Sequence, residues 1–153
     1  MNIDPDTGTL NFPEIGISIT PTLTHEEFVN TPVFSRFTPA VHNLPYRSYF
    51  LPRLQLNDSS LDPTIYFTGE IIDSVHLAHG GERFGLSWSD WSEEKELARK
   101  SFHEKWLKEL NAPAGKYPWG EIFSVYDAKA GAASIIIRYE KKALHLSDDL
   151  SGL

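Results

Sequence analysis

One long helical pattern in the second half of the chain constrains the fold more than any other feature. Asp90 and Glu93 have the spacing of a capping box, and Asn111 and Pro113 supply a stop. Wound as a helix, the apolar residues between these limits fall within a stripe about 120° wide. The stripe consists of Trp91, Ala98, Phe102, Trp106 and Leu110. The pattern predicts an amphipathic helix near residues 90–110 that covers one face of a sheet.

Strand-like segments on both sides of this helix predict the sheet. Gly69-Glu70 fits a two-residue turn between two strands, and residues 127–131 fit a hairpin loop. The apolar run Ile135–Ile137 predicts a central strand. The expected strands are 9–12, 16–20, 46–56, 65–68, 71–77, 121–126 and 133–139.

The first half of the chain adds a shorter helix and two loops. Thr24 and Glu27 have capping-box spacing, which predicts a helix near residues 24–30. Pro32, Pro39 and Pro45 predict a loop, and the composition of 57–63 predicts another. We therefore expect a single α+β domain over residues 1–153. It has a mainly antiparallel sheet of about six or seven strands, the long amphipathic helix on one face and the short N-terminal helix.

Composition excludes several classes of function. The chain has no cysteine, which excludes disulfides, thiolate zinc sites, iron–sulfur clusters and a cysteine nucleophile. Its start lacks the basic and apolar regions of a secretion signal, and no apolar run approaches a membrane span. We therefore expect a cytoplasmic protein with no membrane partner. The net charge of −7, without clustered Lys and Arg, argues against a nucleic-acid partner.

The acidity is concentrated in the first half. Residues 1–73 carry a net charge of −6, whereas residues 74–153 carry −1. An acidic surface steers a basic partner toward it, although modest acidity more often serves solubility.

No catalytic or cofactor motif is present. The sequence contains neither G-x-S-x-G, nor S-x-x-K, nor a phosphate-binding glycine motif. His76 and His79 are the only close histidine pair, and on a strand they point to opposite faces, so neither a metal site nor a cofactor is predicted. His103 falls at the edge of the helical stripe, and we interpret it as a solvated or capping residue.

The tryptophans have a structural interpretation and an alternative. Residues 88–92 match the W-S-x-W-S signature of cytokine receptors, but they run into a charged helix and lack the accompanying cysteines. We treat the match as coincidence: Trp88 and Trp91 pin the helix entrance to the sheet, and Asp90 caps the helix. Core packing is favoured for all four tryptophans. The alternative is an exposed aromatic surface for protein contacts, formed by Tyr117, Trp119 and Tyr126.

Several segments together resemble small bacterial proteins of toxin–immunity loci, including contact-dependent growth inhibition systems. The resemblance implies an immunity protein, a cytosolic inhibitor that binds the toxic C-terminal domain of a delivered effector, often a nuclease, and occludes its active site. No catalytic residue is part of the resemblance. An acidic inhibitor suits a basic nuclease, because complementary charges raise the rate of encounter. The resembling segments are Thr7–Leu10, Ile19–Phe28, Trp88–Glu96, Tyr117–Gly120 and Tyr126–Gly131.

Partner contacts are expected in loops and at sheet edges, where binding residues concentrate. Two other function classes remain open. A small enzyme or ligand-binding domain would use His76, Asp73 or Glu121 in a cleft between the long helix and the sheet. A structural or adaptor subunit would form a homo-oligomer. The candidate contact residues are Asp58, Asp62, Glu70, Asp73, Tyr117 and Trp119.

Overall fold

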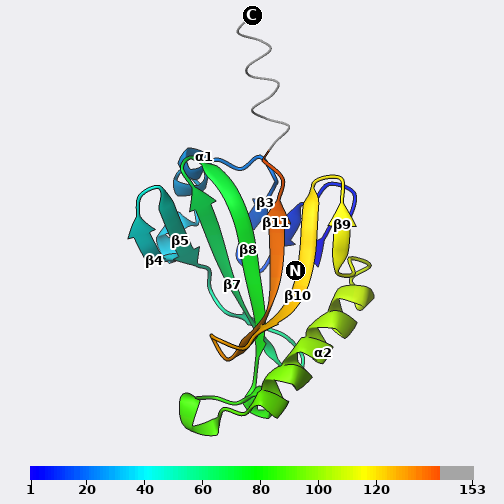
Figure 1. The fold of residues 1–153 in the computed structure, drawn as a ribbon. Coiled ribbons are helices and arrows are strands. Elements are labelled where there is room, and N and C mark those ends of the chain that lie inside the picture. The colour runs from blue at the N-terminus through cyan, green and yellow to red at the C-terminus, as the bar shows by residue number, and fades with distance from the viewer. Residues whose placement is uncertain (142–153) are drawn as a thin grey trace, which may run out of the picture.

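Two antiparallel sheets and two helices make up the fold, which the computed structural model describes for residues 1–141 (Figure 1). The larger sheet has eight strands in the order β4-β5-β7-β8-β11-β10-β9, and β6 also pairs with β7. These strands are β4 (Thr38–Asn43), β5 (Tyr46–Phe50), β6 (Leu54–Gln55), β7 (Ser60–Thr68), β8 (Ile71–Gly80), β9 (Gly115–Tyr117), β10 (Gly120–Asp127) and β11 (Ala132–Tyr139).

The remaining elements are a smaller sheet, two helices and three 3₁₀ turns. The smaller sheet has three strands, β1 (Asn2–Ile3), β2 (Leu10–Phe12) and β3 (Ile17–Ile19). The helices are α1 (His25–Val29) and α2 (Glu93–Glu109), and the 3₁₀ turns are η1 (Phe34–Arg36), η2 (Glu82–Phe84) and η3 (Trp88–Asp90). The mainly antiparallel α+β class with one long helix is confirmed, whereas the larger sheet alone exceeds the six or seven strands expected.

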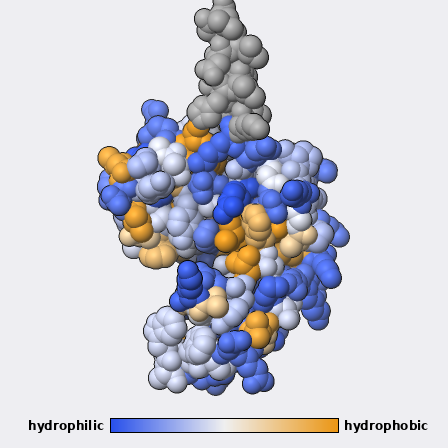
Figure 2. Space-filling view, viewed as in Figure 1, coloured by the Kyte–Doolittle hydropathy of each residue, from blue (hydrophilic) through white to orange (hydrophobic). Residues whose placement is uncertain are grey.

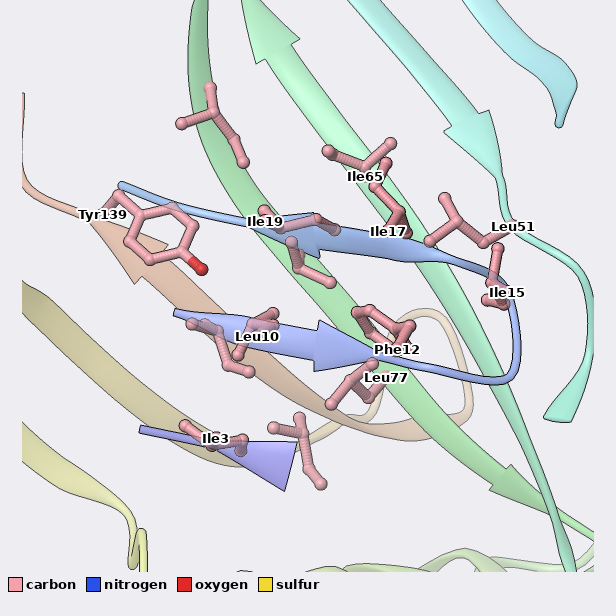
Figure 3. Packing of buried hydrophobic residues seen from close by; sticks show 14 of the residues in the cluster. Ile3, Leu10, Phe12, Ile15, Ile17, Ile19, Leu51, Ile65, Leu77 and Tyr139 are labelled. Carbon is pink, nitrogen blue, oxygen red and sulfur yellow. The ribbon is translucent and has the colours of Figure 1, made fainter. Parts of the chain in front are cut away.

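One face of the larger sheet carries the core. Alternate residues of its central strands, such as Ile65 of β7 and Leu77 of β8, are fully buried there. Figure 3 shows β1–β3 over this face, and their side chains Leu10, Phe12 and Ile17 join one cluster with Ile65 and Leu77. Helix α2 contacts β8, β10 and β11. The small sheet and α2 therefore cover different parts of the same face.

The opposite face of the larger sheet has no second layer among residues 1–141 (Figure 1). Tyr66 and His76 project from neighbouring strands on this face, with their ring centroids 4.3 Å apart. Both side chains are half-buried, while His79 is fully buried on the core side. His76 and His79 thus point to opposite faces, as predicted.

The buried side of α2 is mixed, which corrects the prediction of a purely apolar stripe: Phe102, Trp106 and Leu110 of that stripe are half-buried. Ala98 of the predicted stripe is exposed, and the buried residues are Glu96, His103 and Leu107. The Ala133 backbone N–H donates to Glu96 Oε2 over 2.9 Å. The His79 N–H donates to His103 Nε2 over 3.0 Å. Burial of these side chains is tolerated because they accept hydrogen bonds from the sheet.

The cap of α2 also differs from the prediction. Ser92 is the N-cap, and its Oγ accepts from the Lys95 N–H over 3.1 Å. Asp90 instead lies in η3, where it pairs with the Lys95 ammonium and accepts from the Leu86 N–H over 3.4 Å. Ser and Asp are equally good N-cap residues, so the sequence alone did not show whether Asp90 or Ser92 caps the helix.

Two predicted loops are partly strands. Residues 38–43 form β4, an edge strand whose ladder has a register shift between Pro39 and Val41. An edge strand tolerates proline because one row of its backbone groups has no partner strand. Strand β7 begins at Ser60 and includes Asp62 and Pro63, where a loop was expected.

Local cap and turn signals are confirmed. Thr24 Oγ accepts from the Glu27 N–H over 3.1 Å, and Glu27 accepts in return from the Thr24 N–H over 3.0 Å. The turn between β7 and β8 contains Gly69 at φ +62°, which glycine adopts without strain. Strand β11 lies between β8 and β10, so the central position predicted for Ile135–Ile137 is confirmed.

Candidate protein interface

Eight large hydrophobic side chains are exposed among residues 1–141, and they fall into two surfaces. The first, called the β4–β5 patch, consists of Val41, Leu44, Tyr46 and Phe50. Figure 2 shows apolar residues at the left margin, where Figure 1 places β4 and β5. The second consists of Leu86, Trp88, Trp91 and Leu97. Its first three members lie in residues 81–92, called here the tryptophan loop, which connects β8 to α2.

The first turn of the tryptophan loop is anchored by Phe84. This side chain is buried, and its ring centroid lies 5.4 Å from that of Phe102 in α2. Arg99 Nη2 donates to the Phe84 carbonyl over 2.9 Å. The guanidinium of Arg83 lies 4.4 Å from the Phe102 ring centroid. These contacts fix the start of the loop against the helix that follows it.

The second half of the loop is tied at two more points. Trp91 Nε1 donates to the Gly131 carbonyl over 2.7 Å, which links the loop to the turn between β10 and β11. Lys95 Nζ donates to the Asp90 backbone carbonyl over 2.8 Å and also pairs with the Asp90 carboxylate. Gly85 has φ +88°, a conformation that favours glycine and directs the chain between the two turns.

The fixed backbone presents Leu86 and Trp88 outward. Leu86 is 74% exposed and Trp88 is 78% exposed. The prediction that Trp88 pins the helix entrance to the sheet is therefore wrong, whereas Trp91 does make such a link through Gly131. A cavity of about 350 Å³ lies between the loop, the start of α2 and the β10–β11 turn, and both Trp88 and Trp91 line it.

Four exposed carboxylates lie in or next to the tryptophan loop and make no ion pair within residues 1–141. We call them the acidic rim: Glu82, Glu93, Glu94 and Asp127. Two exposed bases lie in the same region: Arg83, which pairs with Asp58, and Lys129 in the β10–β11 turn. Partial burial, followed by the negative charges of Glu93, Glu96 and Asp127, raises the pKa of Tyr126. The surface is therefore apolar at its centre and negative at its edge.

The structure separates the four acids predicted to contact a partner and gives each a basic neighbour. Asp62 and Glu70 lie at opposite ends of β7, whose six residue steps from Asp62 to Thr68 span about 20 Å. A hydrogen bond from Arg47 lowers the pKa of Glu70. The four pairs are Asp58 with Arg83 at 3.6 Å, Asp62 with Arg53 at 2.7 Å, Glu70 with Arg47 at 2.9 Å and Asp73 with Lys141 at 3.1 Å.

Of these acids, Asp58 is the one whose ion pair reaches the tryptophan loop, because Arg83 belongs to that loop. The other three pair with bases of β5, of the segment after it, and of the segment after β11. An acidic face composed of these four residues is therefore not assembled in the structure.

The two candidate aromatic contacts lie at the other end of the molecule and pack inward. Trp119 is 8% exposed, and its Nε1 donates to the Pro5 carbonyl over 2.8 Å. Tyr117 stacks on it with ring centroids 5.0 Å apart. A Cβ on Gly8 would overlap the Trp119 ring. Tyr139 Oη donates to the Gly8 carbonyl over 2.8 Å. Trp119 thus locks the N-terminal segment to the sheet, in agreement with the core-packing interpretation.

The groove between α2 and the neighbouring strands does not hold the residues of the enzyme alternative. A cavity of about 480 Å³ lies between residues 55–59 and α2, with Phe102 and Trp106 in its wall. His76 lies on the uncovered face of the larger sheet, and Asp73 pairs with Lys141. Glu121 lines a different surface, beside β9. The three named residues therefore do not converge on one cleft.

A pair of buried histidines lies beside this groove. The ring centroids of His79 and His103 are 5.0 Å apart, and neither side chain is exposed. The interpretation of His103 as solvated is therefore wrong. Burial, together with the positive charge of Arg99, lowers the pKa of His79 to about 4 and that of His103 to about 3. Both are neutral in the folded chain at pH 7.

Residues 1–141 contain no group of three His, Cys, Asp or Glu side chains arranged to hold a metal ion. Nor does that part of the chain contain a helix long and apolar enough to cross a membrane.

Comparison with known proteins gives one structural likeness. No protein-family model matches the sequence, and no curated protein matches it. The fold is similar to that of a chain in the solved structure described as "Rhs1-CT in complex with cognate immunity protein RhsI1". The TM-score is 0.57 at 15% sequence identity, and the match covers 99% of this chain and 94% of that chain. At this identity the likeness shows a shared fold.

Proposed function

We propose that this chain is an immunity protein that binds and neutralises the toxic C-terminal domain of a bacterial effector. The observation that carries the proposal is the fold shared, over nearly the full length of both chains, with a member of a toxin–immunity complex. The rigid loop that exposes Leu86 and Trp88 supports it, because large exposed apolar side chains on a fixed backbone are typical of protein-binding surfaces.

The target we propose is a basic nuclease domain of a contact-dependent delivery system, neutralised in the cytoplasm by occlusion of its active site. The net charge of −7 supports a basic partner. An inhibitor of this kind needs no catalytic residue of its own. Its task is to reach the toxin quickly and to dissociate slowly, which depends on complementary charge and on a well-packed apolar contact.

Co-expression tests the proposal directly. The proposal predicts a large effector encoded directly upstream of this chain; the probe is the C-terminal domain of that effector, and the control is a toxin domain from an unrelated locus. We expect growth to be rescued only against the adjacent toxin domain. The purified pair should form a complex with a Kd of about 1 nM or less, the range of tight inhibitors. Growth arrest despite co-expression, with no complex at micromolar concentrations, would contradict the proposal.

A further inference from the structure

The two exposed apolar surfaces differ in their charge. Residues 38–50, which contain the β4–β5 patch, carry one formal charge at pH 7, that of Arg47, and Glu70 pairs with it. The tryptophan loop has the acidic rim around its apolar centre. An apolar centre with a charged rim is the usual composition of a specific protein interface, in which the rim selects the sign of the partner.

The tryptophan loop is also held in its exposed conformation without a partner. Phe84 and Arg99 fix its start, and Lys95 and Trp91 fix its end. A partner that encloses Trp88 therefore does not have to order the loop backbone, and the entropy cost of binding is confined to side chains. Trp is among the residue types that most often dominate the binding energy of an interface.

We propose that Leu86 and Trp88 are the anchor by which this chain docks a basic protein domain, with the acidic rim around them. The inference rests on the proposed immunity function and adds the surface that performs it. The partner surface that fits is an apolar pocket bordered by Lys and Arg side chains. Trp88 fills the pocket, and Glu93 and Glu94 face the basic border.

Charge argues against the other occupants of this surface. A second copy of the chain, docked through the same loop, would bring two acidic rims together, and like charges in an interface oppose association. A nucleic acid would place phosphates beside four carboxylates. A basic protein domain is not repelled by the acidic rim.

The experiment compares two surfaces with one probe, the C-terminal toxin domain encoded beside this chain's gene. Leu86→Ala/Trp88→Ala removes the anchor, and Phe50→Ala in the β4–β5 patch is the matched exposed control. We expect the double variant to raise the Kd at least 30-fold and the control to change it less than twofold. Both variants should keep the wild-type circular dichroism spectrum and melting temperature, because the altered side chains are exposed.

The outcomes separate the inference from the proposed function. If the wild-type chain forms no complex with the toxin domain, the proposed function is overturned. If the wild-type complex forms and the double variant binds equally well, the anchor is overturned while the proposed function stands. If Phe50→Ala weakens binding of the toxin domain more than the double variant does, docking is assigned to the β4–β5 patch and the anchor is also overturned. A wild-type dimer that becomes monomeric in the double variant overturns the assignment of a basic partner.

Discussion

The indole nitrogen of Trp91 donates a hydrogen bond to the carbonyl oxygen of Gly131, 2.7 Å away, and so joins the tryptophan loop to the β10–β11 turn. The two residues are 40 positions apart in the sequence. This bond makes the position of the exposed loop depend on the sheet as well as on α2.

Trp91→Phe removes the indole N–H and keeps an aromatic ring. We expect faster amide hydrogen exchange in residues 82–90 and a loss of about 1 kcal/mol in the free energy of unfolding, the usual contribution of one hydrogen bond. Affinity for the toxin domain should fall severalfold because the loop must then be ordered on binding. Trp88→Phe is the control for exchange and stability, since Trp88 is exposed. Equal exchange in the two variants would contradict the role of the Gly131 bond.

Gly131→Ala tests the same junction from the other side. Gly131 has φ +64°, and a Cβ there would lie 3.3 Å from Trp91 Nε1. Gly69→Ala is a matched control, because Gly69 has φ +62° and a Cβ there meets nothing within 4 Å. The backbone strain common to both is about 1–2 kcal/mol. In urea denaturation we expect Gly131→Ala to lower the free energy of unfolding more than Gly69→Ala does. Equal losses would show that the Trp91 side chain moves away from the added Cβ with no loss of stability.

Reversal of the acidic rim tests the steering of the partner. Glu93→Lys/Glu94→Lys should slow association with the toxin domain about tenfold at low salt and much less at high salt, because salt screens exposed charges. Asp62→Lys/Glu70→Lys changes the net charge by the same amount at acids that are already ion-paired. Stopped-flow rates at two ionic strengths measure the difference. If association is slowed more in Asp62→Lys/Glu70→Lys, the acids of the first half of the chain, and not the acidic rim, steer the partner.

The buried histidines predict a loss of stability in mild acid. An unfolded histidine has a pKa near 6.5, whereas His79 and His103 have a pKa of about 4 and about 3 in the fold. Between these values the unfolded chain binds more protons, so the free energy of unfolding falls as the pH falls below 6.5 and is fully retained above it. Each histidine contributes at most about 1.4 kcal/mol per pH unit.

Urea denaturation between pH 7.5 and pH 5 measures this dependence, in a window above the titration of ordinary carboxylates. His103→Gln is the informative variant, because the amide oxygen can accept the His79 N–H and does not titrate. We expect its pH dependence to be smaller than that of the wild type by about one proton. If the pH dependence of the free energy of unfolding is unchanged in His103→Gln, the loss of stability in acid does not come from His103.

Local signals in the sequence predicted much of the fold. The capping box of Thr24 and Glu27 and the Gly69 turn depend on neighbouring residues alone, so the sequence was sufficient for them. Strand β4 was missed because its prolines favour a loop, and its place is set by pairing with β5. The covered face of α2 was predicted in part, since Phe102, Trp106 and Leu110 are half-buried. Glu96 and His103 were missed because they are buried through hydrogen bonds from distant strands, which periodicity does not report.

The candidate interface was predicted less well. W-S-x-W spacing does not distinguish Trp91, which finds an acceptor 40 residues away, from Trp88, which has none among residues 1–141. The signal present in the sequence was Gly81 and Gly85, which mark a loop and thereby place the following Leu86 and Trp88 on the surface. Charge counted along the chain located the excess acids, but their ion pairs depend on which bases the sheet brings beside them.

Trp119 and Tyr139 reach back to Pro5 and Gly8 across 114 and 131 residues of sequence. During synthesis β1–β3 leave the ribosome long before these partners exist. The contacts that hold residues 5–8 therefore form only after β11 has been translated, and folding is completed in a late step that brings distant segments together. Under the proposed immunity function, protection begins when this step is complete, so the time between translation and a competent inhibitor depends on the most distant contacts of the chain.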